Sequence, residues 1–228
     1  MKLAKHLANL GYGSRKEMAL AIKNGWITNA QGARLQEGQP FTHADIRLDG
    51  APLDPPLGSL IMLHKPVGYT CSTKDHGALV YQLLPERFLR RKPPVSTIGR
   101  LDKDTSGLLL LTDDGKLLHK IISPKSDLPK TYEVTLDRPL HGEEVQLFAS
   151  GTLLLNGETT PLKPAEMEII SSHQARVTIT EGRYHQVRRM FAATGNHVSK
   201  LHRSRIGTLS LADLEQGKWR LVQKQGLF

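Results

Sequence analysis

Apolar positions at the start of the chain recur at the spacing of an amphipathic helix. Residues 3–10 carry leucines three and four positions apart, and glycines end that segment. Ser14 stands three residues before Glu17, a capping-box pattern that predicts the start of a second helix. Residues 25–28 and 34–35 are typical of two short strands around a turn. This pattern predicts a compact module of two small helices and a few short strands at the start of the chain.

Beyond residue 58 the pattern changes to short apolar runs that are typical of strands. Strands are predicted over residues 60–64, 69–72, 108–111, 132–136, 152–155, 165–170 and 175–179. Helices are predicted over residues 78–84, 117–122, 143–149 and 186–193, and a basic loop over residues 87–92. Strands and helices that mix without strict alternation favour an α+β fold with a mixed or largely antiparallel sheet.

Residues 54–58 contain two adjacent prolines and a glycine, which interrupt regular structure and predict a linker. We therefore expect two domains, a small N-terminal module with its linker over residues 1–56 and a larger domain over residues 57–228. A chain of 228 residues is long enough for each of them to enclose a core.

The chain carries 31 lysines and arginines against 22 aspartates and glutamates, a formal net charge of +9. This balance is typical of a protein that binds a polyanion, although charge alone also fits a basic protein with no nucleic-acid partner. Both predicted domains are basic. The side chains that we expect to contact RNA phosphates, each of which also fits an ordinary solvated residue, are Lys5, Arg15, Lys16 and Lys23 in the module and Arg90, Arg91 and Lys92 in the basic loop.

Cys71 is the single cysteine, which excludes an internal disulfide and a cysteine-based metal cluster. His185, His197 and His202 show no metal-binding pattern, so we expect no metal site. The N-terminal residues are too polar for a secretory signal, and no apolar run approaches membrane-spanning length. We therefore expect a cytoplasmic protein with no membrane partner.

Residues 99–102 place an arginine and a carboxylate two positions apart on a predicted tight loop. The run Leu108–Leu111 follows closely and is apolar enough for a strand that is buried on both faces. A charged pair held against a rigid core suits a functional site, whereas a charged surface turn fits these residues equally well. Asp102 and Asp104 are poorly placed to act as the paired carboxylates of a glycosidase, because one loop carries both.

Three further segments accompany this motif, namely Leu63–Tyr69, Lys130–Val134 and Glu181–Phe191. In this order, together with Gly99–Gly115, they resemble the pseudouridine synthases of the RsuA type. Residues 1–50 resemble the S4-like RNA-binding module that this family carries in front. The resemblance implies an enzyme that isomerises a uridine in ribosomal RNA. No cofactor is implied, because the reaction neither oxidises the substrate nor adds a group to it.

The resemblance also implies roles for individual residues. Asp102 is the implied catalytic carboxylate, as a nucleophile or as a general base. Tyr132 is expected to stack on the uracil, with Val187 packed beneath the base. Arg188 is implied to form a salt bridge that keeps Asp102 ionised. Arg100 is expected to fill the space left by the flipped nucleotide or to contact its phosphate.

The run over residues 181–198 is most similar to the small-subunit enzyme of the family, and no long basic tail follows the larger domain. We therefore expect a monomer that modifies one uridine of 16S ribosomal RNA, with a partly assembled small ribosomal subunit as its partner. The alternatives are a large-subunit synthase of the same family and a non-catalytic assembly factor that binds ribosomal RNA. The coexistence of Asp102, Tyr132 and Arg188 favours an enzyme, because a pure binder needs no such set.

Overall fold

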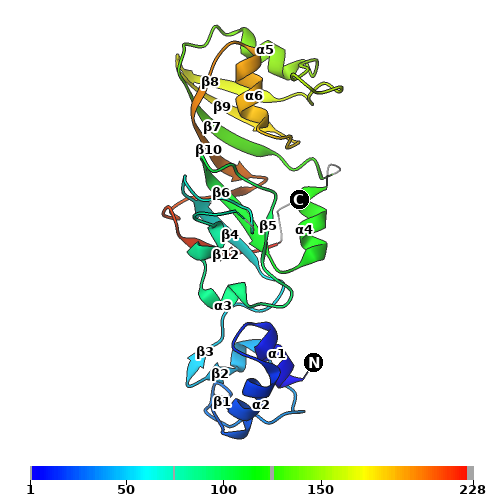
Figure 1. The fold of residues 1–228 in the computed structure, drawn as a ribbon, viewed down its shortest axis with the longest axis vertical. Coiled ribbons are helices and arrows are strands. Elements are labelled where there is room, and N and C mark those ends of the chain that lie inside the picture. The colour runs from blue at the N-terminus through cyan, green and yellow to red at the C-terminus, as the bar shows by residue number, and fades with distance from the viewer. Residues whose placement is uncertain (1, 74, 124–125, 225–228) are drawn as a thin grey trace.

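The N-terminal module forms a separate lobe below the larger domain in the computed structural model, which describes residues 2–73, 75–123 and 126–224 (Figure 1). The described part of the module contains α1 (Leu3–Asn9), α2 (Arg15–Lys23), β1 (Ile27–Thr28), the 3-10 helix η1 (His43–Asp45), β2 (Arg47–Leu48) and β3 (Ala51–Pro52). The three strands pair in order as an antiparallel sheet. The predicted capping box is confirmed, because the Ser14 hydroxyl accepts a hydrogen bond from Glu17 N at 3.2 Å and the Glu17 carboxylate accepts one from Ser14 N at 2.6 Å.

His6 is buried in the apolar core that the two helices of the module form with β1. Its Nε2 lies 2.9 Å from Nδ1 of His43, and its ring packs against Phe41. Burial is the main reason why the pKa of His6 falls from 6.5 to about 4, and the nearby His43 and the N-terminal amino group lower it further. His6 is therefore neutral at pH 7.

We expect the N-terminal module to lose stability as the pH falls from 6.5 to about 4. In this window His6 binds a proton in the unfolded chain but not in the folded one, so acid favours unfolding. Hydrogen exchange measures the loss as lower protection of the α1 amides at pH 5 than at pH 7. His6→Leu should reduce the loss, whereas His173→Gln, at an exposed turn, should not. An equal pH dependence in His6→Leu and the wild type would contradict the prediction.

The described strands of the larger domain form one nine-stranded sheet. They are β4 (Leu60–Lys65), β5 (Ser96–Ile98), β6 (Thr105–Thr112), β7 (Lys130–Leu136), β8 (Glu166–Ser171), β9 (Gln174–Ile179), β10 (Val198–Ile206), β11 (Leu209–Ser210) and β12 (Trp219–Val222). The main order is β12-β4-β6-β10-β7-β9-β8, while β5 pairs with β6 and β11 with β10. β10 and β6 run parallel, and the other pairs in the described sheet are antiparallel. The predicted α+β class with a mixed sheet is confirmed.

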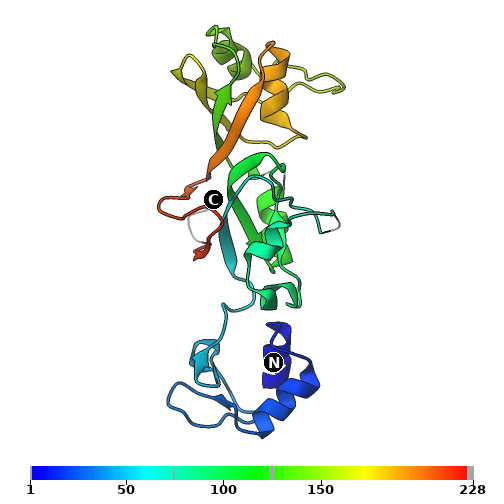
Figure 2. The ribbon, with the colours of Figure 1, turned by 60° about the vertical axis from the view of Figure 1, so that its left-hand side comes forward.

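Helices cover both faces of this sheet (Figures 1 and 2). The helical elements are the 3-10 helix η2 (Val80–Leu83), α3 (Glu86–Leu89), α4 (Gly115–Ile122), α5 (Glu143–Ala149) and α6 (Gln186–Ala193). α5 and α6 pack on one face, where the rings of Phe148 and Phe191 meet edge to face at 5.2 Å. α4 packs on the other face through Leu117 and Ile121. Strands β4 and β6 contribute to both cores, as predicted for the run Leu108–Leu111.

The linker between the two lobes is held by specific contacts. The Arg87 guanidinium donates two hydrogen bonds to the Asp54 carboxylate, at 2.6 and 3.0 Å, and lies over the ring of Tyr12. The Tyr12 hydroxyl accepts a hydrogen bond from Asp54 N at 2.7 Å. Arg87 lies in α3, so the prediction of a loop without helix over residues 87–92 was wrong at its start.

Two predicted strands are absent from the described structure, and one long strand was missed. Residues 152–155 form no strand, although Leu153 and Leu155 are buried, because this extended segment packs on the core without a neighbouring strand. Residues 69–72 contribute an isolated bridge from Thr70 rather than a strand. β10 was not predicted, because its two register irregularities break the alternation of buried and exposed positions. Among the described residues, no helix is long and apolar enough to span a bilayer.

Candidate active site

The motif at residues 99–102 lies at the tip of a hairpin. β5 pairs antiparallel with β6, and the loop over residues 99–104 joins them. Gly99 has a φ of 70°, a left-handed conformation that turns the chain with little strain at glycine. The Asp102 carbonyl accepts a hydrogen bond from Thr105 N at 3.0 Å, which closes the loop directly before β6. The sequence therefore places Asp102 on a short loop that a buried strand supports.

Lys65, at the end of β4, binds the backbone of this loop. Its side chain is fully buried, and Nζ donates hydrogen bonds to the carbonyls of Asp102 at 3.0 Å, Thr105 at 2.7 Å and Pro66 at 3.0 Å. Burial lowers the pKa of Lys65, while its attraction to Cys71 and Asp102 acts in the opposite direction. Lys65 thus fixes the backbone of the loop over residues 99–104 and places a cation next to it.

Strand register aligns four residues in one row across the sheet. Tyr132 of β7 is opposite Arg203 of β10, Arg203 is opposite Gly107 of β6, and Gly107 is opposite Lys65 of β4. A Cβ atom at Gly107 would lie 2.3 Å from the Arg203 carbonyl oxygen, so glycine allows these strands to approach. Side chains that lie opposite one another point to the same face of a sheet. The contacts of Lys65 with the Asp102 carbonyl and of Arg203 with the Arg100 carbonyl place this row next to the loop over residues 99–104.

Arg203 is almost completely buried in the middle of this row, with 3% of its surface exposed. Its Nε donates to the Leu108 carbonyl at 2.8 Å, and one terminal nitrogen makes long contacts with the Tyr132 hydroxyl at 3.4 Å and the Arg100 carbonyl at 3.5 Å. The other terminal nitrogen is buried without a hydrogen-bond partner among the described residues. Arg203 therefore connects the loop over residues 99–104 to Tyr132.

A cavity of about 560 Å³ opens between this row, the loop over residues 99–104 and the start of α6. Its lining includes Arg100, Asp102, Lys130, Tyr132, Tyr184, His185, Val187 and Arg203. The Asp102 side chain is 34% exposed, and its Oδ1 lies 3.2 Å from His185 Nε2. Lys130 also lines the cavity, and burial and the neighbouring Arg203 lower its pKa. The lining also includes Glu181, whose carboxylate accepts hydrogen bonds from Arg183 at 3.2 Å and Gln186 at 3.0 Å, so Asp102 is the more accessible of the two carboxylates in the cavity.

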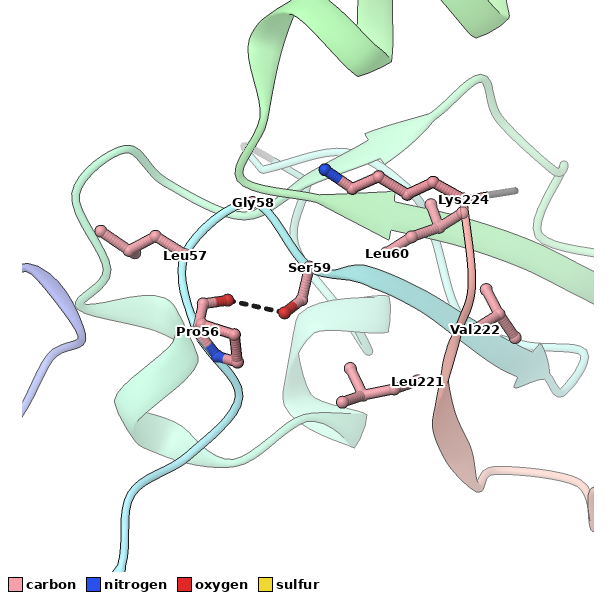
Figure 3. Close-up of a pocket in the computed structure, with 8 residues that line it drawn as sticks. All are labelled: Pro56, Leu57, Gly58, Ser59, Leu60, Leu221, Val222 and Lys224. Atoms are coloured by element: carbon pink, nitrogen blue, oxygen red, sulfur yellow. Dashed lines mark hydrogen bonds between the residues drawn. The ribbon is translucent and has the colours of Figure 1, made fainter. Parts of the chain in front are cut away.

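A smaller cavity of about 220 Å³ lies where the linker meets β12 (Figure 3). Its lining is mostly apolar and includes Leu57, Leu221 and Val222. The charged group in its lining, Lys224, already binds Asp114 at 3.2 Å. Because Lys224 is already paired and no carboxylate lines this cavity, the larger cavity is the candidate active site. Over the described residues, no group of three or more potential metal ligands was found.

Comparison with known proteins agrees with this geometry. Residues 59–193 match the family described as RNA pseudouridylate synthase. The chain belongs to the RNA pseudouridylate synthase family. This match includes the hairpin that carries Asp102, the strand that carries Tyr132 and the whole of α6, and it makes the protein an enzyme that acts on RNA.

Relatives extend the similarity to the full chain. The ribosomal small subunit pseudouridine synthase A of Escherichia coli strain K12 is 48% identical, over 99% of this chain and 97% of the relative. The protein of the same name from Vibrio vulnificus is 39% identical over the same shares. A crystal structure of a pseudouridylate synthase superimposes with a TM-score of 0.69 at 37% identity, and the match covers 100% of this chain and 98% of that one.

One predicted contact of this synthase is wrong. Arg188 and Asp102 are both described, and no ion pair joins them. The Arg188 guanidinium donates instead to the carbonyl of Val198 at the start of β10, at 2.7 Å, and to the carbonyl of Asp104 in the loop over residues 99–104, at 3.1 Å. His185 is the residue that contacts the Asp102 carboxylate. Arg188 therefore connects α6, β10 and the loop through backbone carbonyls.

The predicted RNA-contacting residues divide into two groups. Lys5, Arg15, Lys16, Lys23, Arg90 and Lys92 are exposed, as an RNA contact requires. Arg91 is not exposed, and its prediction was wrong: its guanidinium binds the Asp113 carboxylate at 3.1 Å, and each side chain is 1% exposed. Arg91 also donates to the Pro55 carbonyl at 2.6 Å, so the synthase uses it to hold the linker.

Proposed function

We propose that this synthase isomerises one uridine of 16S ribosomal RNA to pseudouridine, with Asp102 as the essential carboxylate. The observation that carries the proposal is the position of Asp102 in the large cavity, between His185 and the cations of the sheet row. Support for the target comes from relatives named as ribosomal small subunit pseudouridine synthase A, which match 99% of the chain.

The reaction breaks the C1′–N1 bond of uridine, rotates the detached uracil and joins it to C1′ through C5. The enzyme must take the base out of its stack and hold it while it is detached. Asp102 supplies the group that acts on the sugar or the base, either as a nucleophile or as a general base. Tyr132 and Val187 line the same cavity and supply apolar surface for the uracil. Arg100, which is exposed at its edge, suits contact with the RNA backbone.

Release of tritium from uridine labelled at C5 tests the activity. The purified full chain should release tritium from a 16S ribosomal RNA transcript without an added cofactor, because C5 loses its hydrogen when it joins C1′. Mapping of pseudouridines in ribosomal RNA from a strain without the gene tests the target. Loss of a large-subunit pseudouridine with every small-subunit one intact would contradict the target, and absence of tritium release would contradict the activity.

We propose that residues 1–56 form an S4-like RNA-binding domain and residues 57–228 the catalytic domain. The separate core of the module and its exposed basic residues support this division. We also propose that the enzyme is a cytoplasmic monomer that acts on a partly assembled small subunit. Support comes from the need for an accessible strand in base flipping.

Removal of basic residues from the module should weaken the salt dependence of RNA binding. Arg15 and Lys16 are exposed at the start of α2, and the log–log slope of affinity against salt should fall by roughly 0.7–0.9 for each phosphate that the protein no longer neutralises. Fluorescence anisotropy with labelled RNA measures the slope for Arg15→Ala/Lys16→Ala. Arg176→Gln is the control, because Glu133 and Glu168 already balance its charge. An unchanged slope in the double variant would contradict an electrostatic role for these residues.

A further inference from the structure

Two tyrosines line the catalytic cavity and differ sharply in exposure. Tyr132 is 8% exposed and forms part of the buried sheet row, whereas Tyr184 is 74% exposed. Single exposed aromatic residues are common, so the position of Tyr184 on the cavity, and not its exposure alone, indicates a function. Because both side chains line one cavity, Tyr132 marks its floor and Tyr184 marks its mouth.

The ring of Tyr184 is stacked on the side chain that contacts the catalytic carboxylate. The rings of Tyr184 and His185 lie 3.9 Å apart with an angle of 16° between their planes. His185 Nε2 in turn lies 3.2 Å from Asp102 Oδ1. One face of the tyrosine ring is therefore covered by His185, and with 74% of the residue exposed the other face is open to solvent.

The backbone under this stack is held firmly for a surface segment. His185 has a φ of 49°, a left-handed conformation that costs energy for a residue other than glycine and is maintained by its surroundings. Arg189 donates to the Tyr184 carbonyl at 3.2 Å and to the Glu158 carboxylate at 2.9 Å. Arg183, directly before the stack, donates to the carbonyls of Thr160 at 2.7 Å and Pro161 at 2.6 Å. The open face of Tyr184 is thus preorganised before RNA binds.

We propose that the open face of Tyr184 binds the base of a nucleotide next to the flipped uridine, which makes this residue a second base-binding site of the enzyme. This inference rests on the proposed function and adds a subsite to it. A nucleotide whose neighbour has left the stack exposes one face of its own base, and a fixed aromatic ring replaces the missing stacking partner. Arg100, exposed on the same cavity, lies where a phosphate of the same RNA strand can be neutralised.

Steady-state kinetics with C5-tritiated 16S transcript separates this role from a role in chemistry. Tyr184→Ala in the full chain should raise KM roughly 5- to 150-fold, the range expected for one base–aromatic stack, with kcat unchanged. Tyr184→Phe keeps the ring and should keep KM within about twofold of the wild type. Ile170→Ala removes an apolar side chain of β8 that is 45% exposed and does not line the cavity, and it should change neither constant.

A second measurement tests the stack itself. Once the modified uridine is mapped, abasic residues on its 5′ or 3′ side remove the proposed partner of Tyr184. One of the two substitutions should weaken binding to the wild type but have no further effect on Tyr184→Ala, which is the result of a double-mutant cycle for two groups in contact.

An unchanged KM in Tyr184→Ala, or additive losses with both abasic substrates, would overturn the subsite while the proposed function stands. A fall in kcat with unchanged KM would also overturn it and would show that Tyr184 acts through His185 on Asp102. Absence of tritium release by the wild type would instead contradict the proposed function.

Discussion

Asp102→Asn should abolish tritium release while the protein folds and binds RNA as the wild type does. The substitution keeps the shape of the side chain and removes the charge and the nucleophilic oxygen that the reaction requires. Loss of an essential nucleophile or general base costs more than about a thousandfold in rate. Asp102 is partly exposed, so its replacement should change the free energy of unfolding by no more than about 0.5 kcal/mol.

Asp104→Asn is the matched control for this prediction. Asp104 lies on the same loop and is exposed, but it does not line the cavity. Its variant should keep most of the activity of the wild type under the same assay. Residual turnover of Asp102→Asn above about one part in a thousand, with protein free of wild-type contamination, would remove Asp102 from the catalytic role.

Arg91→Met should lower the free energy of unfolding by about 3–5 kcal/mol, because it leaves the buried carboxylate of Asp113 without its cation. Each side chain of this pair is 1% exposed. Asp113 would keep a hydrogen bond from Gly58 N at 2.6 Å, whereas the Pro55 carbonyl in the linker would no longer accept a hydrogen bond from Arg91. Urea unfolding of the full chain measures the change in free energy.

Arg90→Met provides the control on the neighbouring arginine. Arg90 pairs with Glu86 at the surface, where such a pair contributes no more than about 1 kcal/mol. The double variant Arg91→Met/Asp113→Leu should regain part of the stability, because it removes both buried charges together. A loss below about 1 kcal/mol in Arg91→Met would contradict the prediction, because exposed pairs contribute no more than that.

Sequence reasoning succeeded where the signal is local. The capping box at Ser14 and Glu17, the helix over residues 186–193 and the buried strand at Leu108–Leu111 were all predicted and found. Capping, helical period and uninterrupted apolarity each depend on residues within a few positions of one another. The order of the four motifs likewise identified the family, which the comparisons confirm.

The partners of a side chain could not be predicted where they come from residues far away in the sequence. Arg91 was predicted to contact RNA and Arg188 to pair with Asp102. The Asp113 carboxylate accepts the hydrogen bond of Arg91 instead, and the carbonyls of Val198 and Asp104 accept those of Arg188. Nothing in the local sequence distinguishes a solvated arginine from one that a partner far along the chain binds. Residues 198–206 showed no clear alternation, because two irregularities interrupt β10, so the site role of Arg203 was missed with the strand.

The sequence by itself determined the local elements, the chain of motifs and the identity of the residues that carry charge and rings. The tertiary structure alone decided which of them meet. Lys65, Gly107, Tyr132 and Arg203 come from four strands that only sheet pairing brings into one row. Strand register is set by the packing of the whole core, and a shift of one residue would turn these side chains to the opposite face. For this reason the motifs identified the loop that carries Asp102 but did not show which strand residues lie next to it.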